Sequence, residues 1–103
     1  MSDHFEDIRL ASAHPLEVTI YSRPGCHLCE EAKAVIQPLL EEFGATVREV
    51  NIDKDTELAE RYSWDIPVIF LGAHKAAKHR VDARQFRRQL EEARAKTNST
   101  AQR

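Results

Sequence analysis

The stretch YSRPGCHLCEEAK, residues 21–33, holds both cysteines of the chain, Cys26 and Cys29, separated by two residues. Residues 16–21 alternate between apolar and more polar side chains, which is typical of a β-strand, and Pro24-Gly25 then marks a turn. Beyond the cysteines, apolar side chains recur every three or four residues, which is the spacing of one helix face, and Gly44 can end this helix. The pattern therefore predicts that Cys26 stands at the start of a helix.

This position predicts a reactive thiolate on Cys26. The first N–H groups of a helix have no partner within the helix, and the helix dipole is positive there, so both stabilise a sulfur anion. Such a position lowers the pKa of a cysteine from about 8.5 to between about 3.5 and 7.5, and the thiolate is the form that attacks a disulfide. Cys29, one turn further, is expected to be partly covered and to resolve the mixed disulfide formed on Cys26. His27 is a candidate tuning residue, because a protonated imidazole beside Cys26 favours the thiolate.

Other uses of the two cysteines are open on the sequence. A structural disulfide across so short a loop gains little stability. A zinc site needs four ligands, and the chain offers only scattered histidines besides the cysteines, so no resident metal or cofactor is expected. The alternatives to an enzyme are a non-catalytic binding module and a metal or iron-sulfur carrier that uses Cys26 and Cys29 across a dimer.

Length and composition predict one domain with two short extensions. A chain of 103 residues and 11.8 kDa is long enough for one modest core. Residues 1–15 contain Asp3, Glu6 and Asp7 and no apolar run, so we expect an N-terminal extension of a soluble, cytoplasmic protein without a membrane span. We expect the domain over residues 16–96 and a disordered tail over residues 97–103.

Charge is distributed unevenly along the chain. Residues 75–103 contain nine Lys or Arg against three Asp or Glu, a net charge of +6, whereas residues 1–74 contain six against fourteen, a net charge of −8. A solvated helix face is the expected use of the basic segment. No aromatic side chain beyond Phe86 interleaves with its cations, so nucleic acid is not an expected partner.

The rest of the pattern completes an alternating order of elements. Capping residues precede two of the predicted helices, Asp55 for the first and Asp82 for the second. The predicted order is βαβαββα. Its later members are strands over 46–52, 67–71 and, more weakly, 75–80, and helices over 56–62 and from Asp82 to about Ala95.

This order resembles the thioredoxin fold, an α/β fold with a four-stranded mixed sheet flanked by helices. The resemblance is carried by CxxC at the first strand-helix junction and by Ile66-Pro67, 40 residues after Cys26, at the start of a strand. The segments VTIYSRPGCHLCEEAK, VNIDKD, DIPVIFLG and HRVDARQF are more closely similar to the small glutaredoxin-like family, over about residues 16–95. The resemblance implies a thiol-disulfide oxidoreductase in which the Ile66-Pro67 peptide bond is cis and lies beside Cys26. It also implies that the Ile66 backbone pairs with the substrate chain.

The resemblance also bears on glutathione. Arg23, three residues before Cys26, matches the basic residue that holds a glutathione carboxylate, and Asp82 matches the acid that receives the γ-glutamyl end. Asp82 is also a helix cap, and Arg80-Val81 stand where the family has two glycines. Glutathione is therefore an expected co-substrate, but a poor one.

The expected partners are protein or low-molecular-weight disulfides. The reductant is expected to be the thioredoxin or the glutathione system, and the protein is expected to be a monomer. Trp64 either rims the groove beside Pro67 or packs against the fold, and packing is the more common role of such a side chain.

Overall fold

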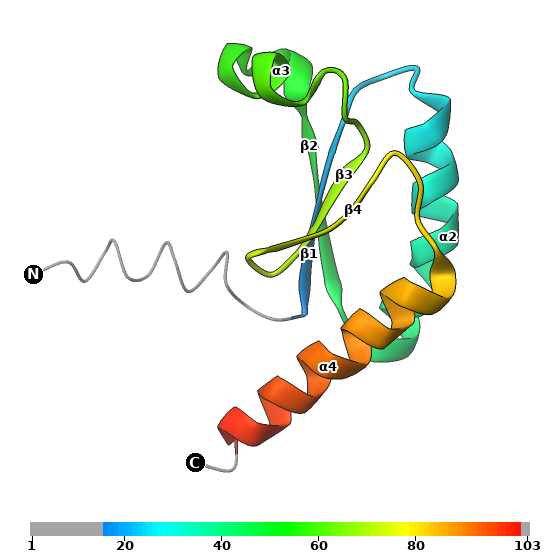
Figure 1. The fold of residues 1–103 in the computed structure, drawn as a ribbon, viewed down its shortest axis with the longest axis vertical. Coiled ribbons are helices and arrows are strands. Elements are labelled where there is room, and N and C mark those ends of the chain that lie inside the picture. Colours follow the sequence, from blue (N-terminus) through cyan, green and yellow to red (C-terminus); the bar gives the residue numbers. More distant parts are fainter. Residues whose placement is uncertain (1–15, 102–103) are drawn as a thin grey trace, which may run out of the picture.

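The computed structural model describes residues 16–101, with side chains up to residue 96, and its element order agrees with the predicted one (Figure 1). A short 3-10 helix after the second strand is the one addition within this part of the chain. The elements are β1 (Glu17–Ser22), α2 (His27–Phe43), β2 (Thr46–Asn51), η1 (Ile52–Lys54), α3 (Thr56–Tyr62), β3 (Val68–Leu71), β4 (His74–Lys78) and α4 (Ala83–Ala101).

The strands form a four-stranded mixed sheet in the order β2-β1-β3-β4. β1 runs parallel to β2 and antiparallel to β3, and β3 runs antiparallel to β4. The register pairs Ser22 with Asn51 and Tyr21 with Val68. The ends of β1, β2 and β4 therefore meet the start of β3 at one end of the sheet, which is called the Cys26 end below.

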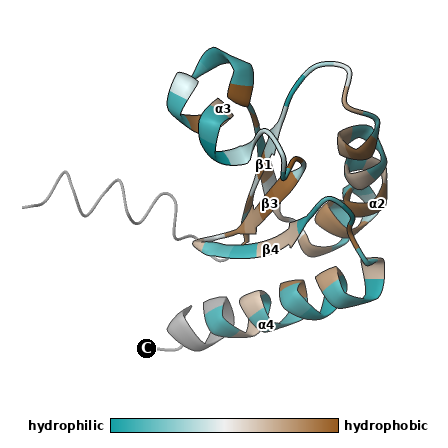
Figure 2. Cartoon of the chain, turned by 45° about the horizontal axis from the view of Figure 1, so that its top comes forward, coloured by the Kyte–Doolittle hydropathy of each residue, from teal (hydrophilic) through white to brown (hydrophobic). Residues whose placement is uncertain are grey.

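Alternate side chains of the strands enter two separate cores, as the pleat of a strand requires. Val18 and Ile20 of β1 pack under α2 and α4, together with buried side chains such as Ile36 and Leu90. On the other face, Val68 packs with Ile52 and Tyr62, beneath η1 and α3. The sheet is thus covered on both faces, and Figure 2 shows β3 and much of α2 as hydrophobic, with α3 and α4 largely hydrophilic.

The helix ends confirm three predictions made from local sequence. α2 ends at Gly44, whose φ of 64° lies in the left-handed region that glycine adopts without a steric penalty. The Asp55 carboxylate accepts hydrogen bonds from the N–H groups of Glu57 and Leu58 at the start of α3. The Asp82 carboxylate accepts those of Arg84 and Gln85 at the start of α4.

The predicted end of the last helix is wrong. α4 continues to Ala101, six residues beyond Ala95, so residues 97–101 are helical rather than a disordered tail. Apolar periodicity in the sequence stops near Ala95, but each added residue of a helix still gains a backbone hydrogen bond, and no glycine or proline interrupts the segment. Residues 1–15 and 102–103, the expected N-terminal extension and the last part of the expected tail, lie outside the described residues. Among the residues described, no helix has both the length and the hydrophobicity needed to cross a membrane.

Candidate active site

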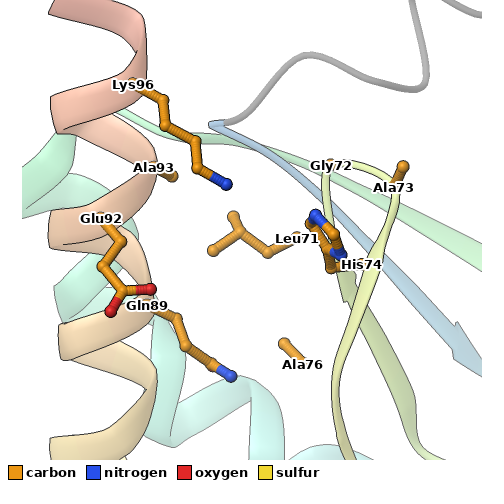
Figure 3. A pocket seen from close by; sticks show the side chains of 9 residues that line it. All are labelled: Leu71, Gly72, Ala73, His74, Ala76, Gln89, Glu92, Ala93 and Lys96. Atoms are coloured by element: carbon orange, nitrogen blue, oxygen red, sulfur yellow. The ribbon is translucent and has the colours of Figure 1, made fainter.

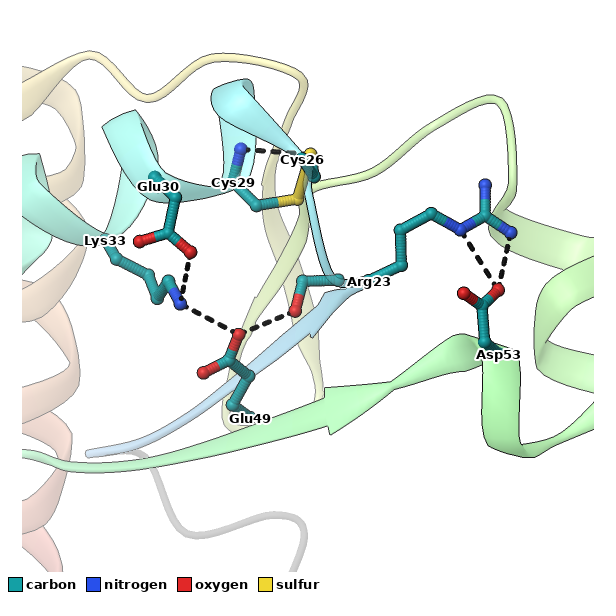
Figure 4. Close-up of a disulfide and its surroundings, with 8 residues drawn as sticks. Arg23, Cys26, Cys29, Glu30, Lys33, Glu49 and Asp53 are labelled. Atoms are coloured by element: carbon teal, nitrogen blue, oxygen red, sulfur yellow. Dashed lines mark hydrogen bonds and ion pairs between the residues drawn. A yellow bond between two sulfur atoms is a disulfide. The ribbon is translucent and has the colours of Figure 1, made fainter.

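Cys26 and Cys29 are joined by a disulfide, with their Cα atoms 5.2 Å apart. Cys26 is the N-cap of α2, and its Sγ accepts a hydrogen bond from the Cys29 N–H at 3.1 Å (Figure 4). Sulfur thus takes the place of the hydroxyl or carboxylate oxygen that usually caps a helix. Cys26 is partly exposed, whereas Cys29 is only 1% exposed. A reagent in solution therefore reaches Cys26 before Cys29.

The peptide bond between Ile66 and Pro67 is cis, which confirms what the family resemblance implied. Tyr21, near the end of β1, pairs with Val68 of β3. Pro67 is the residue before Val68 and therefore lies beside the end of β1, at the Cys26 end of the sheet. The Ile66 N–H donates to the Tyr62 carbonyl at 3.1 Å. A substrate chain that pairs with this N–H has to displace that bond.

Arg23 is already engaged by a carboxylate. Its Nη2 and Nε lie 2.7 and 3.0 Å from Asp53 Oδ1, and these hydrogen bonds raise the pKa of Arg23 above its usual value. Its Nη2 also lies 3.4 Å from the Ser63 hydroxyl. The predicted anchor for a glutathione carboxylate must therefore give up an internal partner before it binds one.

Arg80 and Val81, which precede α4, place side chains where the family has two glycines. Val81 packs against the main core, and the Arg80 guanidinium lies 3.9 Å from Glu31 on α2. Asp82 acts as the cap of α4, as described above. Its second predicted role, in binding the γ-glutamyl end of glutathione, stays a prediction. His27 is exposed in the first turn of α2, and its tuning role also stays a prediction.

A polar network beside the disulfide was not predicted from the sequence (Figure 4). Glu49 Oε2 on β2 accepts a hydrogen bond from the Ser22 hydroxyl at 2.7 Å and one from the Lys33 ammonium at 3.0 Å. Lys33 also lies 3.0 Å from Glu30 in the first turn of α2. The hydrogen bond from Ser22, followed by that from Lys33, holds the pKa of the Glu49 carboxyl below its usual value, and Glu30 and Glu49 raise the pKa of Lys33. The network ties the first turns of α2 to β1 and β2.

A cavity of about 540 Å³ lies between the β3–β4 hairpin and α4 (Figure 3), and neither cysteine lines it. Leu71, Gly72 and His74 line it at the hairpin, and Gln89, Glu92 and Ala93 line it on α4. None of the predicted site residues belongs to it. Across the described part of the chain, no group of three or more His, Cys, Asp or Glu side chains is arranged to hold a metal ion.

The network makes a pH-dependent contribution to stability that Glu49→Gln tests. A carboxyl whose pKa is lower in the folded state stabilises the fold above its unfolded pKa, near 4.5, and loses that contribution as the pH falls through the folded value. We expect Glu49→Gln to lower the free energy of unfolding at pH 7 by up to about 1 kcal/mol, because solvent screens a half-exposed carboxylate. Urea unfolding at pH 7 and pH 3 should show the difference from the wild type shrinking at pH 3.

The matched control is Glu60→Gln, which neutralises an exposed carboxylate on α3 and should change stability little at either pH. A Glu49→Gln deficit of equal size at pH 7 and pH 3 would show that the charge of Glu49 contributes nothing.

Comparisons with known proteins bear directly on the fold and the family. Residues 17–91 match the family described as Glutaredoxin-like domain (DUF836). The chain is 33% identical over 73 residues to the glutaredoxin-like protein YDR286C homolog of Dictyostelium discoideum, covering 65% of this chain and 68% of that protein.

Solved structures show the same fold. Protein Ne2328 of Nitrosomonas europaea superposes with a TM-score of 0.61 at 28% identity, covering 70% of this chain and 87% of that one. The germline-specific thioredoxin Deadhead of Drosophila melanogaster superposes with a TM-score of 0.54 at 23% identity, covering 89% and 92% of the two chains. The α/β fold with its four-stranded mixed sheet is therefore the thioredoxin fold, and the chain belongs to the glutaredoxin-like family of the thioredoxin superfamily.

Proposed function

We propose that this protein is a thiol-disulfide oxidoreductase that works by dithiol exchange through Cys26 and Cys29. The observation that carries the proposal is the unequal environment of the two sulfurs. Cys26 is accessible and caps a helix N-terminus, whereas Cys29 is buried one turn away and close enough to bond with it. The Cys29 N–H that faces Cys26 Sγ and the positive end of the helix dipole stabilise its thiolate, and the thiolate is the attacking form.

The exchange proceeds in two balanced steps. The Cys26 thiolate attacks one sulfur of a substrate disulfide, which forms a mixed disulfide and releases the other substrate sulfur as a thiolate. The Cys29 thiolate then attacks Cys26 Sγ, which releases the second substrate thiolate and forms the Cys26–Cys29 disulfide seen in the structure. Two electrons pass from the protein to the substrate, and the released thiolates take protons from water. We place this reaction in the cytoplasm, where thiols are kept reduced.

Single cysteine variants test the order of attack. After prior reduction and mixing with hydroxyethyl disulfide, Cys26→Ser should form no adduct, because the remaining thiol is buried. Cys29→Ser should accumulate a stable mixed disulfide on Cys26, because resolution is lost while attack remains. Mass spectrometry of the intact proteins and their peptides reads out both results. The wild-type protein should form the Cys26–Cys29 disulfide and accumulate no mixed disulfide. A Cys26→Ser variant as reactive as the wild type would contradict the assignment of Cys26 as the nucleophile.

We further propose that glutathione is a weak reductant for the Cys26–Cys29 disulfide. Arg23 has Asp53 as a partner, and Arg80 with Val81 fills the place of two glycines. Glu30 and Glu31 add negative charge to the turn that a glutathione anion has to approach. A protein reductant such as thioredoxin does not depend on those small-molecule contacts.

The test supplies the oxidised protein with glutathione and its reductase, or with thioredoxin and its reductase, and follows NADPH consumption. We expect the thioredoxin system to be faster by about tenfold or more. Asp53→Asn frees Arg23 and should raise the glutathione rate by up to about fivefold, the equivalent of a surface ion pair of about 1 kcal/mol. The same substitution should leave the thioredoxin rate unchanged. Fast turnover with glutathione that Arg23→Ala does not diminish would refute both the obstruction and the anchor.

A further inference from the structure

Trp64, the single tryptophan of the chain, is 90% exposed. The packing role expected from the sequence is therefore wrong. Val47, the other large hydrophobic side chain exposed in the described part of the chain, is 47% exposed and lies on β2 near the end remote from Cys26. An indole in water forgoes the burial that normally stabilises a fold, and large aromatic side chains are enriched at binding hot spots.

The exposure of Trp64 is not due to a loosely held loop. The Trp64 carbonyl lies 3.0 Å from Nε2 of His79, at the end of β4. The N–H groups of Asp65 and Ile66 both donate to the Tyr62 carbonyl, at 2.8 and 3.1 Å. The backbone is thus fixed on both sides of Trp64, and the loop holds the indole in solvent rather than packed against the rest of the described chain.

The loop that carries Trp64 lies at the Cys26 end of the sheet (Figure 1). The hydrogen bond from Arg23 to Ser63 joins the residue just before Trp64 to the loop that leads into Cys26. Pro67, which lies beside the end of β1, follows three residues after Trp64. An extended chain bound across Cys26 and Pro67 therefore has Trp64 within reach of its flanking residues.

The segment that leads up to Trp64 carries a net negative charge. Residues 53–65 contain five acidic and two basic side chains, a net charge of −3. Asp53 and Asp65 have cationic partners, Arg23 and Lys78, at 2.7 and 3.7 Å. Glu57 and Glu60 on α3 are exposed and have no ion-pair partner among the described residues. A cation from outside is therefore attracted to this surface, and the face of an indole also favours cations.

We propose that Trp64 is a docking contact for polypeptide disulfides whose cysteine is flanked by basic side chains. This inference rests on the proposed exchange at Cys26 and adds its substrate class. A basic residue next to the substrate cysteine stacks on the indole while Cys26 attacks the neighbouring sulfur. A small disulfide without flanking residues cannot make this contact, so it reacts without using Trp64.

The kinetic test uses three disulfides and the reduced protein in single turnovers. The probes are the disulfide dimer of the peptide Gly-Lys-Lys-Cys-Gly, the same dimer with glutamate in place of lysine, and hydroxyethyl disulfide. We expect Trp64→Ala to slow the reaction with the lysine dimer about three- to tenfold. The rate with hydroxyethyl disulfide should stay within about twofold of the wild-type rate. Trp64→Phe should retain most of the wild-type rate with the lysine dimer, and Val47→Ala, the matched control, should change no rate.

Two outcomes overturn the docking proposal and leave the exchange reaction intact. In the first outcome, Trp64→Ala changes the reaction rates of all three probes equally or changes none of them. In the second, the wild-type protein reacts faster with the glutamate dimer than with the lysine dimer. Failure of the wild type to react with any probe contradicts the exchange reaction instead.

A binding measurement tests the docking separately from the chemistry. In the double variant Cys26→Ser, Cys29→Ser, the fluorescence comes from Trp64 alone among tryptophans. The peptide Gly-Lys-Lys-Ser-Gly should quench or shift this emission saturably, and its glutamate counterpart should not. Equal responses to the two peptides, or no response to the lysine peptide, contradict the docking contact.

Discussion

The hydrogen bond from the Cys29 N–H to Cys26 Sγ joins the fold of this protein to its proposed chemistry. It caps α2, which then runs to Gly44 and places Ala32, Ile36 and Leu40 against the sheet. In the proposed exchange, the same N–H points at the sulfur that carries the negative charge before it attacks a disulfide. The start of the helix and the proposed reactivity of Cys26 thus have one physical origin.

The position of β1 in the sheet explains why the other site residues gather near Cys26. β1 lies between β2 and β3, so its end adjoins both the end of β2 and the start of β3. The end of β2 leads to Asp53, and the start of β3 follows the cis peptide bond at Pro67. Segments about 30 and 40 residues away in sequence are therefore brought to the loop that carries Cys26. The Arg23–Asp53 ion pair and the Arg23–Ser63 hydrogen bond join these segments.

The sequence predicted what depends on local pattern. The order of elements, the glycine at the end of α2 and the caps Asp55 and Asp82 all follow from side-chain periodicity and short-range hydrogen bonds. The cis bond at Pro67 came only from the family resemblance, because few bonds before proline are cis and no local pattern marks them.

The long-range contacts of the residues around Cys26 were not predicted. Pairing of Arg23 with Asp53 and of Ser22 with Glu49 joins residues 30 and 27 positions apart, and their register is set by the whole sheet. The occupied N–H of Ile66 and the exposure of Trp64 depend on how the loop before β3 folds back on α3 and β4. The helical continuation to Ala101 has no apolar periodicity to reveal it.

We propose that Cys26, and not Cys29, is the attacking thiol, and the relative alkylation rates of the two thiols measure this difference. The reduced protein is treated with limiting iodoacetamide at pH 6, and peptide mapping follows the modification of each cysteine with time. We expect Cys26 to react at least about tenfold faster than Cys29, because its thiolate is stabilised at the helix N-terminus and reaches solvent. Equal rates, or faster modification of Cys29, would contradict the assignment of nucleophile and resolver.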